Sequence, residues 1–338
     1  MINVTRSIMP SMDKYVSGLQ ELWKTRWLTN NGNYLIKFEK ALSERFDTNC
    51  AVVSNGTLAL MIALELFDFP TGSEIITTPF SFVATTSAIL WQKYKPVFVD
   101  IDAETFNIDP KKIEEKISKK TKAILAVHVF GNPCEIEEIE KIASEYDLKV
   151  IYDAAHCFDV YYKNKSIYKF GDVSIASFHA TKVFHTIEGG AVFSDDPQIV
   201  EKAKRLRNFG FNPNIEIVDV GINAKMNEFQ ALMGLLNLEI IDEEINKRKR
   251  KFELYKELLD GAPVRFQKFN RNMTKYNYIY LAVLFEDNQT RERIYKKLYE
   301  NGYNTRKYFS PSLNKVFSEE SKLFSVFPDQ VYRSSVCS

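Results

Sequence analysis

The chain has 338 residues, of which 45% are hydrophobic and 26% are charged, a composition typical of a soluble globular protein with more than one domain. Its formal net charge of +1 lacks the basic excess of nucleic-acid-binding domains, so we expect a small-molecule partner and no nucleic acid. The longest apolar run, residues 58–67, is interrupted by Glu65, so we expect neither a secretion signal nor a membrane span.

Short β-rich runs alternate with helical patterns between residues 50 and 195, which predicts an α/β fold with a mainly parallel sheet covered by helices on both faces. Seven strands are predicted, at residues 50–55, 73–78, 96–101, 123–129, 149–154, 173–178 and 190–195. Only residues 179–189 join the last two strands. That is too short for a crossover helix, so we expect one of the two to run antiparallel.

The C-terminal third has a different pattern. A long helix is predicted near residues 226–260, a strand at 276–285 and a helix at 290–302. We therefore expect a large domain over residues 1–240, including an N-terminal arm, and a smaller α+β domain over 241–338. The large domain should carry the chemistry.

The four cysteines, at positions 50, 134, 157 and 337, lie far apart and form no CxxC pair. This spacing predicts neither a disulfide framework nor a zinc site, and it favours a reducing cytoplasm.

The first predicted strand ends in Ser54-Asn55-Gly56-Thr57 and leads directly into an apolar helix. The free N–H groups and the positive dipole at such a helix start favour an anion, and Gly56 would let a phosphate approach the backbone. The alternative interpretation is an ordinary N-cap.

Asp153 stands at the end of the fifth predicted strand, after a run of apolar and aromatic residues. A carboxylate there would be partly desolvated, so we expect a positive group to face it. The alternative is an aspartate that caps the next turn. All four histidines (128, 156, 179 and 185) fall near these strand ends; packing is their ordinary explanation, and no metal site is indicated.

Lys182 follows the sixth predicted strand and is flanked by Val183 and Phe184. A lysine in apolar surroundings costs free energy unless it is paired or neutral, and a neutral lysine is the nucleophile that forms an imine with an aldehyde. The alternative is a lysine at the sheet edge that extends its ammonium group to water. A phosphate cradle, a carboxylate and a lysine in one cleft match the phosphate, pyridine nitrogen and aldehyde of pyridoxal 5'-phosphate.

The sequence resembles the DegT/DnrJ/StrS family of nucleotide-sugar aminotransferases over nearly its whole length. The resemblance is carried by segments in the family's order: WLTNNGNYLIKFEKAL (27–42), SNGTLAL (54–60), PFSFVATTSAI (79–89), PVFVDID (96–102), YDAAHCFD (152–159), SFHATKVFHTIEGGA (177–191), GINAKMNEFQA (221–231) and RKYFSP (306–311). It implies the fold-type I pyridoxal-phosphate architecture, with a seven-stranded, mostly parallel sheet and a smaller C-terminal α+β domain.

Carried over by position, the resemblance implies that Lys182 forms the imine with the cofactor and that Asp153 contacts its pyridine nitrogen. It also implies that Gly56, Thr57 and Ser177 hold the phosphate.

Five more positions follow from the resemblance. Phe82 would stack on the cofactor ring, and His156 stands near the ring hydroxyl, where the family usually has glutamine. Asn223 would reach the phosphate of a neighbouring subunit, which implies a homodimer with shared active sites. Lys225 and Tyr308 would contact the substrate.

Within the family, residues 179–190 and RKYFSP are most similar to enzymes that act on dTDP-4-keto-6-deoxyglucose with glutamate as the amino donor. Enzymes that aminate 3-keto sugars share the first motif and are an alternative. A sugar dehydratase is a second alternative, disfavoured because those relatives have histidine in place of the lysine. A non-catalytic regulator that kept the pocket is a third, and a nicotinamide enzyme lacks its GxGxxG motif here.

Members of the family usually continue past a segment such as VYRSSVCS (331–338) with a further strand and helix. The resemblance therefore implies that the smaller domain is truncated in this sequence.

Overall fold

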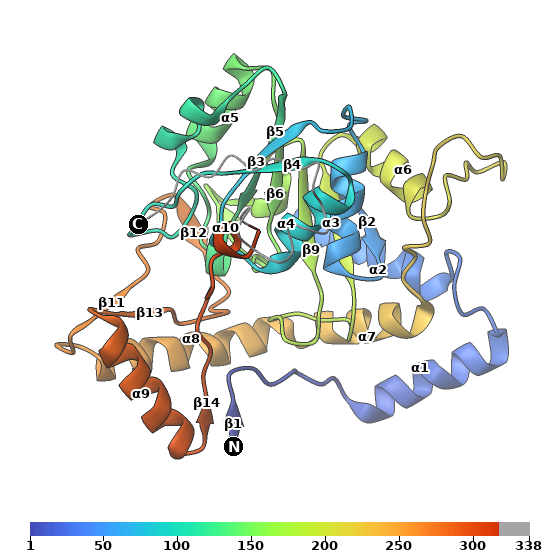
Figure 1. The fold of residues 1–338 in the computed structure, drawn as a ribbon. Helices are drawn as coiled ribbons and strands as arrows, with labels where there is room; N and C mark the ends of the chain where they lie inside the picture. The colour runs from blue at the N-terminus through green and yellow to red at the C-terminus, as the bar shows by residue number, and fades with distance from the viewer. Residues whose placement is uncertain (318–338) are drawn as a thin grey trace.

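A seven-stranded sheet lies at the centre of the protein (Figure 1), whose computed structural model describes residues 1–317. The strand order is β2-β10-β9-β6-β5-β3-β4. The strands are β2 (Asn49–Val53), β3 (Glu74–Thr77), β4 (Lys95–Phe98), β5 (Thr121–Val127), β6 (Lys149–Asp153), β9 (Val173–Ser177) and β10 (Gly190–Ser194). Each corresponds to one of the seven predicted strands.

Strand β10 runs antiparallel to both of its neighbours, β2 and β9, and all other pairs in this sheet are parallel. The prediction that one of the last two strands is reversed is therefore confirmed. The predicted α/β class with a seven-stranded, mostly parallel sheet is confirmed as well.

Side chains along each strand point alternately to the two faces of the sheet, so both faces are apolar, and helices cover each of them to form two cores. One core joins Val52, Ile76 and Ile124 to helices on the first face, α2 (Asn33–Phe46), α5 (Ile136–Glu145) and α7 (Glu228–Leu238). The other joins Val53, Ile75 and Leu125, which neighbour these residues on the same strands, to helices on the second face, α3 (Gly56–Glu65), α4 (Val83–Trp91) and α6 (Pro197–Leu206).

A buried carboxylate ties two of these helices together. Glu228, the first residue of α7, is 1% exposed and accepts hydrogen bonds from the backbone N–H groups of Tyr34 and Leu35. These donors belong to the first turn of α2, where N–H groups have no acceptor within the helix. The contact fixes α2 against α7 beneath the sheet.

The predicted single helix over 226–260 is wrong, because the segment forms two helices, α7 and α8 (Ile241–Leu258). Helix α7 is mainly apolar and mostly buried. Helix α8 is mainly charged and opens with acidic residues 242–244, which stabilise a new helix N-terminus.

The predicted strand over 276–285 is only partly correct, because β13 (Val283–Phe285) covers just its end. Tyr276 and Asn277 make side-chain contacts instead: the Tyr276 hydroxyl donates to the carbonyl of Phe130, and the Asn277 amide donates to the carbonyls of His156 and Phe158. These contacts hold the segment against the large sheet and override its β propensity.

The remaining elements are short, apart from two helices, α1 (Met12–Thr25) and α9 (Asn288–Glu300). Helix α9 confirms the helix predicted at residues 290–302. The others are β1 (Ile2–Asn3), β7 (Tyr161–Tyr162), β8 (Lys165–Ser166), β11 (Val264–Phe266), β12 (Met273–Lys275), β14 (Tyr303–Asn304), α10 (Leu313–Val316) and the 3₁₀ turns η1 (Pro110–Lys112), η2 (Glu114–Lys116), η3 (Val129–Gly131) and η4 (Ile167–Lys169).

Strand β12 pairs with β7, whereas β11 pairs with β13 and β14 pairs with β1.

The domain boundary near residue 240 stays a prediction, and residues 331–338, with Cys337, lie outside the described residues. No helix within residues 1–317 is long and apolar enough to cross a membrane. The other three cysteines are buried and unpaired.

Candidate active site

The first predicted site element lies where β2 ends and α3 begins. A Cβ atom on Gly56 would lie 2.8 Å from the Cβ and 3.0 Å from the Oγ of Ser177, so only glycine fits this position. Asn55 caps α3, since its side chain accepts from the N–H of Leu58 at 2.9 Å. The N–H groups of Gly56 and Thr57 have no acceptor within the helix. The predicted N-cap is therefore present, and it leaves these two N–H groups and the nearby hydroxyl of Ser177 for the anion site that the sequence predicts.

Asp153 ends β6 and is 6% exposed. Its Oδ2 accepts a hydrogen bond from the hydroxyl of Thr85 at 2.8 Å, and its Oδ1 accepts from the N–H of Ala155 at 3.2 Å. Burial raises the pKa of Asp153, and the two hydrogen bonds and the nearby charge of Lys182 oppose that rise. The carboxylate does face a positive group, as expected from its sequence position.

Lys182 lies in the loop between β9 and β10. The loop is closed by two backbone hydrogen bonds of Phe178, whose N–H donates to the carbonyl of Gly189 and whose carbonyl accepts from the N–H of Thr186. It is anchored by Val183 and Phe184, which are 1% and 0% exposed. Lys182 itself is only partly exposed. Burial lowers the pKa of Lys182 to about 8, and the charge of Asp153 opposes this shift. Within residues 1–317, the ammonium group of Lys182 forms no ion pair with a carboxylate.

His156 is oriented by Phe130, whose N–H donates to His156 Nδ1 at 3.2 Å. Phe130 has a φ of 56°, an uncommon conformation for a residue with a side chain, and this conformation directs its N–H at the imidazole. Burial and the charge of Lys182 lower the pKa of His156 well below its usual value. The ring is therefore neutral, and its proton resides on Nε2.

Aromatic side chains flank His156. The ring of Tyr280 lies 5.3 Å from the imidazole, and the ring of Tyr308 lies 5.4 Å from Tyr280 and 5.6 Å from Phe130. Phe82 directly precedes α4 and is 61% exposed. Through its contacts with Tyr280 and Phe130, Tyr308 lies in the cluster of aromatic rings beside His156.

Asn223 and Lys225 lie on the segment between α6 and α7, which runs beside the end of β2: Lys225 pairs with Val53, and the N–H of Ser54 donates to the carbonyl of Ala224 at 2.8 Å. Lys225 Nζ donates to Asn208 Oδ1 at 2.9 Å and lies 4.6 Å from the centre of the Phe209 ring. Burial and the charge of Arg207 lower the pKa of Lys225. Asn223 is exposed, and its side chain has no hydrogen bond to the other site residues within the described chain.

Sequence reasoning missed Thr85. It lies within PFSFVATTSAI, and the signal that could have drawn attention to it is the run of three hydroxyl side chains, Thr85-Thr86-Ser87, at the start of a helix whose other residues are apolar. The structure shows it 1% exposed with its hydroxyl on Asp153.

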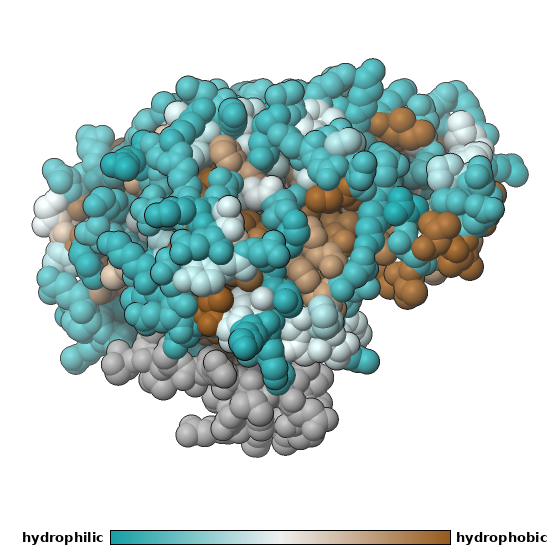
Figure 2. Space-filling model, turned by 90° about the horizontal axis from the view of Figure 1, so that it is seen from above, coloured by the Kyte–Doolittle hydropathy of each residue, from teal (hydrophilic) through white to brown (hydrophobic). Residues whose placement is uncertain are grey.

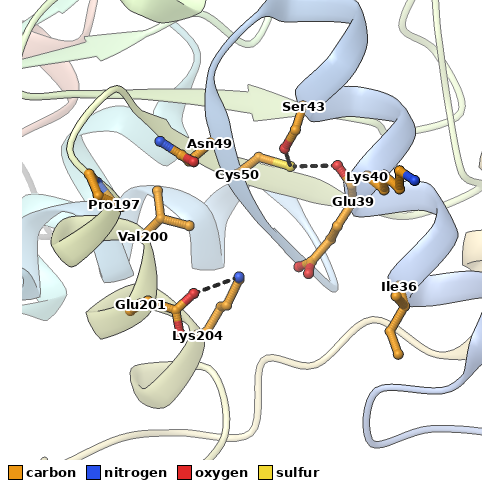
Figure 3. A pocket seen from close by; sticks show the side chains of 10 residues that line it. All are labelled: Ile36, Glu39, Lys40, Ser43, Asn49, Cys50, Pro197, Val200, Glu201 and Lys204. Atoms are coloured by element: carbon orange, nitrogen blue, oxygen red, sulfur yellow. Dashed lines mark hydrogen bonds and ion pairs between the residues drawn. The ribbon is translucent and has the colours of Figure 1, made fainter.

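A separate pocket of about 250 Å³ lies at the opposite, amino end of β2, between α2 and α6 (Figure 3). Its lining includes Ser43, Cys50 and the ion pair of Lys204 with Glu201. None of the predicted site residues contributes to it. No group of three or more potential metal ligands occurs among the described residues.

The chain belongs to the DegT/DnrJ/EryC1/StrS aminotransferase family, whose sequence model matches residues 12–329. It is 41% identical over 320 residues to the dTDP-4-amino-4,6-dideoxy-D-glucose transaminase of Escherichia coli, an alignment covering 93% of this chain and 85% of that protein. It is 32% identical over 296 residues to the GDP-perosamine synthase of Escherichia coli O157:H7, covering 87% and 81%. The crystal structure of DesI in the presence of its TDP-sugar product matches with a TM-score of 0.87 at 29% identity, covering 97% of this chain and 82% of that one. The family resemblance is confirmed.

The lowered pKa of Lys182 predicts a pH dependence. In protein freed of cofactor, the rate of imine formation with added pyridoxal phosphate should rise as pH increases through about 8, because only the neutral amine is nucleophilic. The rate is measured by stopped-flow absorbance, with Lys182→Ala as the blank. A midpoint near pH 10.5, the ordinary pKa of lysine, would contradict the assignment of Lys182 as the residue that forms the imine.

Proposed function

We propose that this protein transfers the amino group of L-glutamate to carbon 4 of dTDP-4-keto-6-deoxy-D-glucose and releases dTDP-4-amino-4,6-dideoxy-D-glucose. The aminotransferase class follows from the family. The observation that carries the proposed site is that β6 and β9 are adjacent and parallel, so Asp153 at the end of β6 and the loop after β9 that contains Lys182 lie at the same carboxyl edge of the sheet. The choice of sugar rests on the relative with 41% identity.

The residues at this edge fit pyridoxal 5'-phosphate, the cofactor of the class. Only glycine fits at position 56, and it opens a cradle of backbone N–H groups beside the Ser177 hydroxyl. The aldehyde would lie near Lys182, whose pKa is lowered, and the ring nitrogen would lie near the buried carboxylate of Asp153. When bound, the cofactor supplies an aldehyde for amines and a sink for electrons.

Each side chain has a defined task in this proposal. The neutral Nζ of Lys182 would hold the aldehyde group of the cofactor, and in its free form it would accept and return a proton of the substrate. The Asp153 carboxylate would keep the ring nitrogen protonated. The Nε2–H group of His156 would donate to the ring oxygen, a task that glutamine could also perform.

Lys182 also bears on the alternative reactions. A dehydratase of this family has histidine in place of the lysine, so the lysine at position 182 favours transfer over dehydration. A regulator that kept the pocket would retain the same residues, and only an activity assay separates it from an enzyme. The same assay separates 4-amination from 3-amination.

We further propose a homodimer in which Asn223 and Lys225 complete the partner's active site. The loop that carries them exposes large apolar side chains: Ile215 is 78%, Ile217 is 73% and Val220 is 89% exposed. Figure 2 shows brown hydrophobic patches on the right of a mainly hydrophilic surface, the side on which Figure 1 draws this loop and α1. Burial of such side chains against a second copy supplies a driving force for association.

The substrate assignment is tested by product analysis. Protein incubated with glutamate and dTDP-4-keto-6-deoxy-D-glucose should yield the 4-amino sugar and 2-oxoglutarate, identified by mass spectrometry and NMR. A GDP-linked 4-keto-6-deoxy sugar should react more slowly. A 3-amino product, or turnover of the GDP substrate alone, would overturn the choice of substrate, and no turnover with either sugar would favour the regulator.

The shared site is tested by subunit complementation. Lys182→Ala and Asn223→Asp variants should each be inactive, the second because its carboxylate repels the partner's phosphate. Co-expressed, they should regain about one quarter of wild-type activity, since half of the dimers are mixed and each mixed dimer has one intact site. If Asn223 serves its own subunit, every mixed site lacks one residue and no activity returns.

A further inference from the structure

Two hydroxyl groups form a chain that leads to Asp153. The hydroxyl of Thr85 lies 2.8 Å from Asp153 Oδ2, and the hydroxyl of Ser81 lies 2.7 Å from that of Thr85. Ser81, Thr85 and Asp153 are 3%, 1% and 6% exposed, so solvent does not compete for these bonds. Thr85 belongs to the first turn of α4, and Ser81 lies just before this helix.

The donors and acceptors available to these groups decide which of them donates in each hydrogen bond. An ionised carboxylate only accepts, so Thr85 donates its single proton to Asp153. The Thr85 oxygen can then accept from Ser81. Since the N–H of Ala155 donates to the other carboxylate oxygen, both oxygens of Asp153 are held and the group cannot rotate freely.

We propose that Thr85, supported by Ser81, is a positioning residue that fixes the carboxylate of Asp153 and favours its ionised form when pyridoxal phosphate is bound. The inference rests on the proposed contact between Asp153 and the pyridine nitrogen. Thr85 acts through Asp153 and touches no reacting atom.

The physical basis is the desolvation of Asp153. Burial alone favours the neutral acid, and the donors around the carboxylate oppose it. Loss of the Thr85 hydroxyl therefore shifts Asp153 toward its protonated form at neutral pH, and a neutral acid holds a protonated pyridine nitrogen less tightly. The effect is confined to ligands that carry the ring nitrogen.

The adjacent Thr86 provides a matched control. It is 0% exposed and lies on the same helix, but its hydroxyl has no hydrogen-bond partner among the described residues. Replacing either threonine with valine removes one buried hydroxyl with little change in shape. Only Thr85→Val removes a donor from Asp153.

The experiment compares the dissociation constants of pyridoxal phosphate and 1-deazapyridoxal phosphate, which has carbon in place of the ring nitrogen. The wild type should prefer the natural cofactor. Thr85→Val should lower this preference about tenfold, the loss expected for one hydrogen bond to a charged group. Ser81→Ala should lower it less, and Thr85→Ser and Thr86→Val should retain it.

The outcomes separate the two assignments. A folded Thr85→Val protein with the wild-type preference would overturn the role of Thr85 and leave that of Asp153 intact. A wild type without any preference would overturn the contact of Asp153 with the ring nitrogen, and the inference with it. If Thr85→Val does not fold, Ser81→Ala decides, and an unchanged preference in that variant counts against the proposal.

Discussion

The carboxylate of Asp153 is buried and the side chain of Lys182 is only partly exposed, and the charge of each group affects the pKa of the other. Burial raises the pKa of Asp153 and lowers that of Lys182, while their mutual attraction opposes both shifts. A lysine near its midpoint at pH 8 is both a nucleophile and a proton carrier, whereas an exposed lysine is almost wholly charged. The chemistry proposed here depends on this balance, and the surrounding hydrogen bonds maintain it.

The sheet brings these groups together because their strands end at one edge. Strands β2, β6 and β9 contribute Gly56, Asp153 and Ser177 at or just beyond their carboxyl ends. Reversal of β10 lets the chain return through a short loop, and the buried Val183 and Phe184 fix that loop so that Lys182 turns back over the sheet. A crossover helix at this point would carry the lysine away from Asp153. The antiparallel strand is thus a condition for the site.

The sequence was sufficient to predict the sheet, because apolar runs of strand length separated by helical patterns leave few other arrangements. It also located Gly56, Asp153 and Lys182 at strand ends. The break between α7 and α8 was missed, since a continuous helical pattern does not reveal where a buried segment passes into a charged one. The strand predicted at 276–285 was displaced by side-chain hydrogen bonds from Tyr276 and Asn277, which sequence propensity does not contain. Thr85 was missed for a similar reason, because its partner is 68 residues away.

Peptide mapping shows whether Lys182 is the residue that binds the cofactor covalently. The purified protein, loaded with pyridoxal phosphate, is reduced with borohydride, digested and analysed by mass spectrometry. The account predicts that the mass of the reduced cofactor is found on the peptide that contains Lys182. Cofactor attached to another lysine, or an unmodified Lys182 peptide from protein that retains its cofactor, would contradict it.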